Sequence, residues 1–400
     1  MDGTLSFSLS LAALRLRPHP PLAPFVAPQP QVTALSSPNP FEPMTFTRGP
    51  AMKNRFMLAP LTNLQSHPDG RLSEEEFHWL TLRAKGGFGL TMSCAAHVQR
   101  VGQGFPGQLG IWSDDHLEGL TRLATEIKRH DSVAVIQIHH AGMRSPADLI
   151  GEAPHCPSDN DEFKARALTG AEVEQLTEDF IAAAVRAEKA GFDGVELHGA
   201  HGYVLCQFLS PEVNQRTDRW GGSLENRTRI VRDIIDGVRA RCRPDFNLGI
   251  RLSAERFGIP LTEALAFAQQ LMSEDKIDYL DMSLWDVTKQ PEEEAFKGRT
   301  LLSYFTELKR GNVRLGAAGK VRNAADVRAA LDAGLDYVLL GRAAILHHDF
   351  PKLMRADAEF EPIATPVTRE HLRREGLSPG FVEYMNGWKG FVAAEESEMA

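Results

Sequence analysis

From Phe41 onward, short apolar runs alternate with amphipathic stretches. The runs are almost continuously apolar, as expected of parallel strands that are buried on both faces. The stretches between them place apolar residues at helical spacing. We expect eight strands, at residues 55–60, 89–93, 133–139, 193–198, 247–253, 277–283, 312–317 and 336–341.

The helices between these strands have clear boundaries. Thr169 and Glu172 form a capping box, and the helix that they begin is expected to end at Gly191. Asn323 can cap a helix that runs to Gly334, directly before the eighth strand. Eight strand–helix units in about 310 residues predict an α/β fold of the closed (β/α)8 TIM-barrel type rather than a doubly wound sheet.

Long connections follow the third, fourth and sixth expected strands, at residues 140–168, 199–223 and 284–300. In a barrel these loops lie at the C-terminal face, where active sites are found. We therefore look for the chemistry of this chain at the ends of its strands.

Composition excludes several classes of protein. The net charge of −9 is unlike that of a nucleic-acid-binding surface, and no apolar run reaches the length of a membrane helix. The four cysteines lie far apart without a C-x-x-C pair, which argues against a zinc ribbon or an iron–sulfur cluster. We expect no metal, no nucleic-acid partner and no membrane span.

The ends of the chain differ from its middle. Residues 1–40 are rich in proline and have one acidic residue, Asp2, which is typical of a disordered extension or a transit-like segment. Residues 41–360 are expected to form the barrel, and residues 361–400 a tail that packs on the barrel or on a partner subunit. We expect a cytoplasmic protein, with organellar import through residues 1–40 left open, and the sequence does not decide whether it is a homo-oligomer.

The fourth strand ends in a cluster of polar side chains: His198, His201 and Tyr203. Imidazoles can donate hydrogen bonds to an oxyanion, and a phenol can deliver a proton. The alternatives are polar side chains satisfied within a loop, or a metal site. The metal reading is weaker, because the H-x-x-H spacing is not that of a helical zinc pair.

Two polar residues interrupt otherwise apolar strands. Arg251 needs an anionic or strongly accepting partner if it is buried. That partner is either a ligand or an internal carboxylate such as Glu196 or Asp281. The amide of Gln137 offers hydrogen-bond donors and an acceptor, which can pair with the polar edge of a heterocyclic ligand.

The seventh and eighth strands end in glycine-bearing turns. Ala318 and Gly319 follow the seventh strand, and Gly341 and Arg342 lie at the end of the eighth. In barrels these two loops form the usual phosphate site, because small residues expose backbone N–H groups to the anion. The alternative is a pair of tight turns that serve packing.

These motifs together resemble the Old Yellow Enzyme family of NAD(P)H:flavin oxidoreductases. The resemblance covers residues 41–353 and is most specific at residues 53–62, 198–203 and 207–227. It implies a non-covalent FMN, NADH or NADPH as electron donor, and a ping-pong reduction of the C=C bond of small α,β-unsaturated carbonyl compounds. The rival interpretation is a non-redox barrel, such as a lyase or aldolase, that uses the same phosphate-binding loops.

The resemblance also implies roles for individual residues. His198 and His201 would hold the substrate carbonyl oxygen, and Tyr203 would deliver a proton. Ser93, at the end of the second expected strand, would lie close to the flavin ring. The other cofactor contacts would come from Ala59, Pro60, Leu61 and Thr62 beside the flavin, Gln137 and Arg251 on its pyrimidine side, and Ala318, Gly319, Gly341 and Arg342 at its phosphate.

Overall fold

The computed structural model describes residues 38–394. The expectations for residues 1–37 and 395–400 lie outside the described residues.

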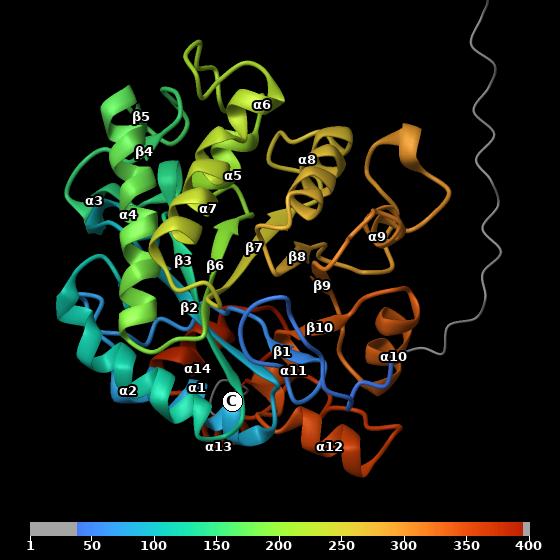
Figure 1. The fold of residues 1–400 in the computed structure, drawn as a ribbon. Helices are drawn as coiled ribbons and strands as arrows, with labels where there is room; N and C mark the ends of the chain where they lie inside the picture. Colours follow the sequence, from blue (N-terminus) through green and yellow to red (C-terminus); the bar gives the residue numbers. More distant parts are fainter. Residues whose placement is uncertain (1–37, 395–400) are drawn as a thin grey trace, which may run out of the picture. The chain divides into compact units, whose positions relative to one another are not determined.

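Eight parallel strands form a closed barrel (Figure 1). The barrel closes at β1, where Met57 pairs with Leu90 on one side and with Leu339 on the other. The predicted TIM-barrel fold is therefore confirmed. The strands, in their order around the barrel, are β1 (Phe56–Leu58), β10 (Tyr337–Leu340), β9 (Arg314–Ala318), β8 (Tyr279–Ser283), β7 (Asn247–Ser253), β6 (Gly194–Gly199), β3 (Val133–His139) and β2 (Leu90–His97).

Helices surround the strands, and shorter elements lie in the loops. The helices of the barrel are α1 (Glu74–Gly86), α2 (Leu117–Lys128), α4 (Gly170–Lys189), α7 (Arg229–Arg241), α8 (Leu261–Ser273), α9 (Leu301–Thr306), α10 (Ala324–Asp332) and α11 (Arg342–Leu346). The loops hold η1 (Arg100–Gly102), η2 (Asp114–His116), η3 (Gly142–Arg144), α3 (Ala147–Ile150), β4 (His155–Cys156), β5 (Arg166–Ala167), α5 (Val204–Leu209), α6 (Leu224–Arg227) and η4 (Glu294–Phe296). The chain continues with α12 (Phe350–Ala356), α13 (Arg369–Arg374) and α14 (Pro379–Asn386).

The helix caps expected from the sequence are present. The Thr169 hydroxyl accepts from the backbone N–H of Glu172, and the Glu172 carboxylate accepts from the backbone N–H of Thr169. Asn323 accepts a hydrogen bond of 2.8 Å from the backbone N–H of Asp326. Each cap satisfies an N–H group that the first helical turn would leave without a partner.

Tyrosine rings fill the interior of the barrel. Tyr279 lies over Gly249 and Tyr337 over Gly316, so closely that an added Cβ would stand 2.0 Å and 2.1 Å from the respective rings. Phe46, from the segment before β1, packs on Tyr279 with ring centroids 5.7 Å apart. Burying the apolar ring of Phe46 contributes roughly 1.5–3 kcal/mol.

The second strand is longer than the sequence predicts. β2 runs to His97, and its register against β3 shifts between Met92 and Ala95. Ser93 therefore lies in a bulge inside the strand, and its predicted place at the strand end is wrong. The bulge interrupts the ladder, and the Ser93 hydroxyl accepts from the backbone N–H of Gln137 at 3.2 Å instead.

The C-terminal tail contacts the barrel. Val367 bridges to Val392, and Phe381 of α14 packs edge-on against Trp79 of α1 with centroids 5.5 Å apart. No helix within residues 38–394 is long and apolar enough to cross a membrane. In the same range no group of three or more His, Cys, Asp or Glu residues could hold a metal ion, and all four cysteines are buried and free.

Candidate functional site

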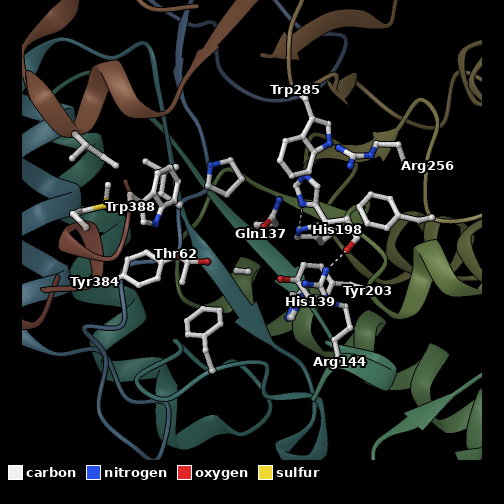
Figure 2. Close-up of a pocket in the computed structure, with 18 residues that line it drawn as sticks. Thr62, Gln137, His139, Arg144, His198, Tyr203, Arg256, Trp285, Tyr384 and Trp388 are labelled. Atoms are coloured by element: carbon white, nitrogen blue, oxygen red, sulfur yellow. Dashed lines mark hydrogen bonds between the residues drawn. The ribbon is translucent and has the colours of Figure 1, made fainter. Parts of the chain in front are cut away.

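Two adjoining cavities open at the C-terminal ends of the strands. The first, of about 440 Å³, is lined by histidines and is here called the histidine cavity (Figure 2). The second, of about 720 Å³, is lined by Arg251 and Arg342 among others and is called the arginine cavity. Both cavities are lined by Pro60, Leu61 and His201, so they adjoin at these residues.

A left-handed turn after β6 brings the predicted histidines and tyrosine together. His201 and Gly202 have φ angles of 61° and 69°, and Tyr203 then caps α5. At position 202 a Cβ would stand 2.8 Å from the ring of Phe257, which makes glycine necessary there. The turn places the His198 ring 5.0 Å from the rings of both His201 and Tyr203.

Hydrogen bonds assign the protons of the two imidazoles. Nδ1 of His198 accepts from the backbone N–H of Ala200 at 3.3 Å, so its proton lies on Nε2. This Nε2–H donates to Nδ1 of His201 at 3.2 Å, and Nε2–H of His201 donates to Ser283 Oγ at 2.6 Å. Burial lowers the pKa of both rings well below 6.5, so both are neutral donors.

Tyr203 has the environment of a proton donor. Burial raises the pKa of its phenol, and the Arg144 cation opposes this rise. The Arg144 guanidinium lies over the Tyr203 ring, 5.0 Å from its centroid, and donates to the carbonyl oxygen of His201 at 2.5 Å. The phenol is therefore neutral, and a cation stands beside it to stabilise the phenolate that remains after proton transfer.

His139 is a third imidazole in this cavity, and the sequence motifs did not indicate it. Its Nδ1 accepts from the Gln108 amide at 3.0 Å, and the oxygen of that amide accepts from the backbone N–H of Gly104 at 2.6 Å. The proton of His139 therefore lies on Nε2, which has no hydrogen-bond partner among the described residues. Its position at the C-terminal end of β3 was the signal that could have identified it.

Aromatic side chains from distant parts of the chain complete the histidine cavity. Trp285 follows β8, Phe105 lies in the loop after β2, and Tyr384 and Trp388 come from the C-terminal tail. Figure 2 shows Tyr384 and Trp388 across the cavity from His139 and Tyr203. Trp285 could have been expected here because it follows a strand end, as His139 does. No local sequence pattern predicts that the C-terminal tail reaches this cavity.

Most of the predicted cofactor residues line these cavities. Thr62 and Gln137 line the histidine cavity, and Ser93 lines neither. Gly319 approaches the chain closely, since an added Cβ would stand 2.8 Å from the backbone nitrogen of Asp286. The residues that line the arginine cavity as expected are Ala59, Pro60, Leu61, Arg251, Ala318, Gly319, Gly341 and Arg342.

Arg251 has the internal carboxylate partner that the sequence left open as an alternative. Its Nε lies 3.0 Å from Asp281 Oδ2, but the two are not aligned for a hydrogen bond. Gln137 donates to Glu196 Oε1 at 2.7 Å. Burial and the neighbouring Asp281 raise the pKa of Glu196 to about 8, so Glu196 keeps its proton at neutral pH.

The arginine cavity fits FMN on the chemistry of its lining. Arg322 and Arg342 supply cations where the glycine turns of β9 and β10 expose the backbone, as a phosphate requires. Lys320 lines the same cavity and is paired with Asp286 at 2.7 Å. Arg251 also lines this cavity, and its Nε has no aligned acceptor among the described residues, so it can serve an electron-rich ring edge.

Comparisons with known proteins agree with this geometry. Residues 40–359 match the model of the NADH:flavin oxidoreductase / NADH oxidase family. "Probable NADH-dependent flavin oxidoreductase YqiG" of Bacillus subtilis is 38% identical over 76% of this chain and 85% of its own length. The solved old yellow enzyme homologue from Zymomonas mobilis has a TM-score of 0.73 and 27% identity over 87% of this chain and 99% of its own.

A structure of morphinone reductase in complex with tetrahydroNAD is similar too, with a TM-score of 0.70 and 27% identity over 87% of this chain and 97% of its own. The predicted enzyme class, the FMN cofactor and the NAD(P)H donor are confirmed by these matches. They do not favour the lyase or aldolase alternative. The chain belongs to the NADH:flavin oxidoreductase / NADH oxidase family, as one of the Old Yellow Enzyme-like oxidoreductases.

Proposed function

We propose that this oxidoreductase is an ene-reductase that reduces the C=C bond of small α,β-unsaturated carbonyl compounds in a ping-pong cycle. The observation that carries the proposal is the meeting of Tyr203 with neutral His198 and His201 in a cavity that adjoins the arginine cavity. A proton donor and oxyanion donors beside a redox cofactor are what this reduction needs.

Residues of the two cavities would hold a non-covalent FMN. Gly319, Gly341 and Arg342 would bind its phosphate, and Gln137 and Arg251 its pyrimidine edge. Bound FMN supplies the hydride transfer, from NAD(P)H in one half-reaction and to the substrate in the other. The polarisation of the substrate carbonyl and the protonation of the substrate carbon depend on side chains of this protein.

The histidines would polarise the substrate. A carbonyl oxygen that enters beside His198 competes with Nδ1 of His201 for the same Nε2–H, 3.2 Å away. Both rings are neutral and carry a proton on Nε2. They can therefore donate hydrogen bonds to an oxygen that gains negative charge during the reaction. This hydrogen bonding draws electron density away from the C=C bond.

Tyr203 would protonate the substrate carbon next to the carbonyl. Its Oη gives up the proton, and the Arg144 cation over the ring stabilises the phenolate. The tyrosine then recovers a proton from water. Aromatic residues on the opposite side, including Tyr384 and Trp388, confine a planar substrate within the cavity.

The proposal is tested with purified protein under anaerobic conditions. We expect a flavin spectrum, FMN rather than FAD by mass after heat release, bleaching by NADH or NADPH, and reoxidation by cyclohexenone with formation of cyclohexanone. A colourless protein that cannot be reconstituted with FMN, or a reduced enzyme that cyclohexenone does not reoxidise, would contradict it.

A further inference from the structure

The histidine cavity is positively charged. Among the residues that line it within the described range, none is an Asp or Glu, whereas two, Arg144 and Arg256, are arginines. Arg256 faces the Glu292 carboxylate at 3.9 Å. Arg144 forms no ion pair with any residue in 38–394, so its charge is not neutralised by the described chain.

The position of Arg144 is fixed by its neighbours. It is the last residue of η3, which follows β3, and its Nη1 donates to the carbonyl oxygen of His201 at 2.5 Å. The guanidinium lies over the Tyr203 ring, as Figure 2 shows. One N–H group thus holds the guanidinium in place, and the guanidinium has further N–H groups that a ligand can use.

His139 provides a second donor near Tyr203. Its ring contacts the Tyr203 ring edge-on with centroids 4.4 Å apart, and the side chain is 1% exposed. Its Nε2–H is the donor left without an acceptor in the described chain. A buried N–H without a partner is unfavourable in free energy. A ligand that accepts a hydrogen bond from it would remove this cost.

We propose that Arg144 and His139 form a carboxylate subsite, and that the preferred substrates are α,β-unsaturated carbonyl compounds that carry a carboxylate. A carboxylate has two oxygens, which can accept one hydrogen bond from each side chain. It also neutralises the cation in a cavity without acidic residues. This inference rests on the proposed ene-reductase function and specifies its substrate class.

The anion could also come from the phosphates of NAD(P)H. The carboxylate is favoured because Arg144 and His139 both contact the ring of Tyr203, the residue that protonates the substrate. The experiment therefore measures the reduction of the enzyme by NADH and by NADPH separately from its reoxidation by the substrate.

The test compares an acid with its uncharged ester in the FMN-loaded enzyme. We expect kcat/KM for 4-oxopent-2-enoate to exceed that for its methyl ester, and the acid:ester ratio to fall about ten- to a hundredfold in Arg144→Gln, as for the loss of a charge-assisted hydrogen bond. The ratio corrects for any slower protonation by Tyr203. Arg144→Lys keeps a cation and should recover part of the ratio.

A further measurement does not depend on turnover. The saturated acid 4-oxopentanoate should bind more tightly than its methyl ester. Their binding is measured by the change in fluorescence of Trp285 and Trp388, which line the cavity. His139→Leu should reduce the preference less than Arg144→Gln does, because it removes a neutral donor. Arg129→Gln, whose side chain is 72% exposed at the end of α2, serves as the control and should change neither measurement.

The outcomes separate the two proposals. Equal kcat/KM for acid and ester in the wild type, or an unchanged ratio in Arg144→Gln, overturns the carboxylate subsite while the ene-reductase function stands. A loss in Arg144→Gln that is confined to reduction by NADH or NADPH also overturns it, since the anion is then a phosphate of the donor. If neither acid, ester nor cyclohexenone reoxidises the reduced enzyme, the proposed function itself fails.

Discussion

Nε2 of His198 lies 3.2 Å from Nδ1 of His201, and the hydrogen bond between them continues through Nε2 of His201 to Ser283. Each imidazole therefore already has an acceptor for its proton. A substrate oxygen binds by replacing one of these acceptors, so the net gain is smaller than that of two new hydrogen bonds.

His198→Ala should weaken the binding of phenolate ligands, because the oxyanion loses the hydrogen bond from Nε2–H of His198. The expected loss is about 1.5–3 kcal/mol, the range for a hydrogen bond to a charged group. Absorbance titration of the FMN-loaded enzyme with 4-hydroxybenzaldehyde measures it. Equal dissociation constants for wild type and His198→Ala would show that His198 serves the fold alone.

Arg251→Ala should both lower FMN retention and destabilise the protein. Asp281, 0% exposed, would lose the cation that lies 3.0 Å from its carboxylate. Breaking a buried pair on one side costs about 3–5 kcal/mol. The double variant Arg251→Ala/Asp281→Asn removes both charges and should recover stability in a thermal melt without recovering FMN.

Gln137→Ala provides the comparison for Arg251. Its amide contributes neutral hydrogen bonds, so the loss in FMN affinity should be about 0.5–1.5 kcal/mol. Titration of the apo-protein with FMN measures both variants. If Gln137→Ala lost as much affinity as Arg251→Ala, the charge of Arg251 would not be what holds the cofactor.

Much of the barrel could be predicted because its signals are local. The strands expected at residues 133–139 and 247–253 agree with β3 and β7 to the residue. The position of Ser93 could not be predicted from such local signals. A bulge depends on how β2 meets β3, and the apolar pattern of one strand does not record it.

The site could be predicted where the chain places its polar residues side by side, as in the turn from His198 to Tyr203. Arg251 was harder, because its pairing with Asp281 depends on which strands are neighbours. Trp388 could not be predicted at all. It reaches the cavity from the C-terminal tail, and no spacing in the sequence connects it to β6.

Glu196→Gln should remove a pH dependence of stability. Burial and the charge of Asp281 raise the pKa of Glu196 from 4.5 to about 8, and Arg251 and Gln137 oppose this rise. The folded state thus holds this proton more tightly than the unfolded chain. The associated stability is present below about pH 4.5 and is lost as the pH rises through about 8.

Chemical denaturation of the apo-protein at pH 5 and pH 8 tests this. From pH 5 to pH 8 the wild type should lose more free energy of unfolding than Glu196→Gln, which keeps an oxygen for Gln137 and cannot ionise. Asp281, whose pKa burial raises to about 6, remains in both proteins, and its coupling to Glu196 is part of the difference that Glu196→Gln removes. Parallel losses in the two proteins would place the titration elsewhere.

Tyr203→Phe should separate the two half-reactions. The variant keeps the ring that contacts His139 and Arg144 and removes only the hydroxyl. FMN binding and reduction by NAD(P)H should persist, while reoxidation by cyclohexenone should slow by about 10²-fold or more, because carbon protonation loses its acid. Tyr304→Phe, which removes a hydroxyl bonded to the carbonyl oxygen of Phe296 outside the cavities, is the matched control.

Stopped-flow absorbance of the flavin times each half-reaction of Tyr203→Phe. Reoxidation by a quinone or by oxygen requires no proton on carbon, so it should stay fast in this variant and show that the cofactor is intact. The assignment fails if Tyr203→Phe slows the reduction by NAD(P)H and leaves the reaction of prereduced enzyme with cyclohexenone unchanged. The hydroxyl would then act on the nicotinamide, and the proton on carbon would come from water or from another group in the cavity.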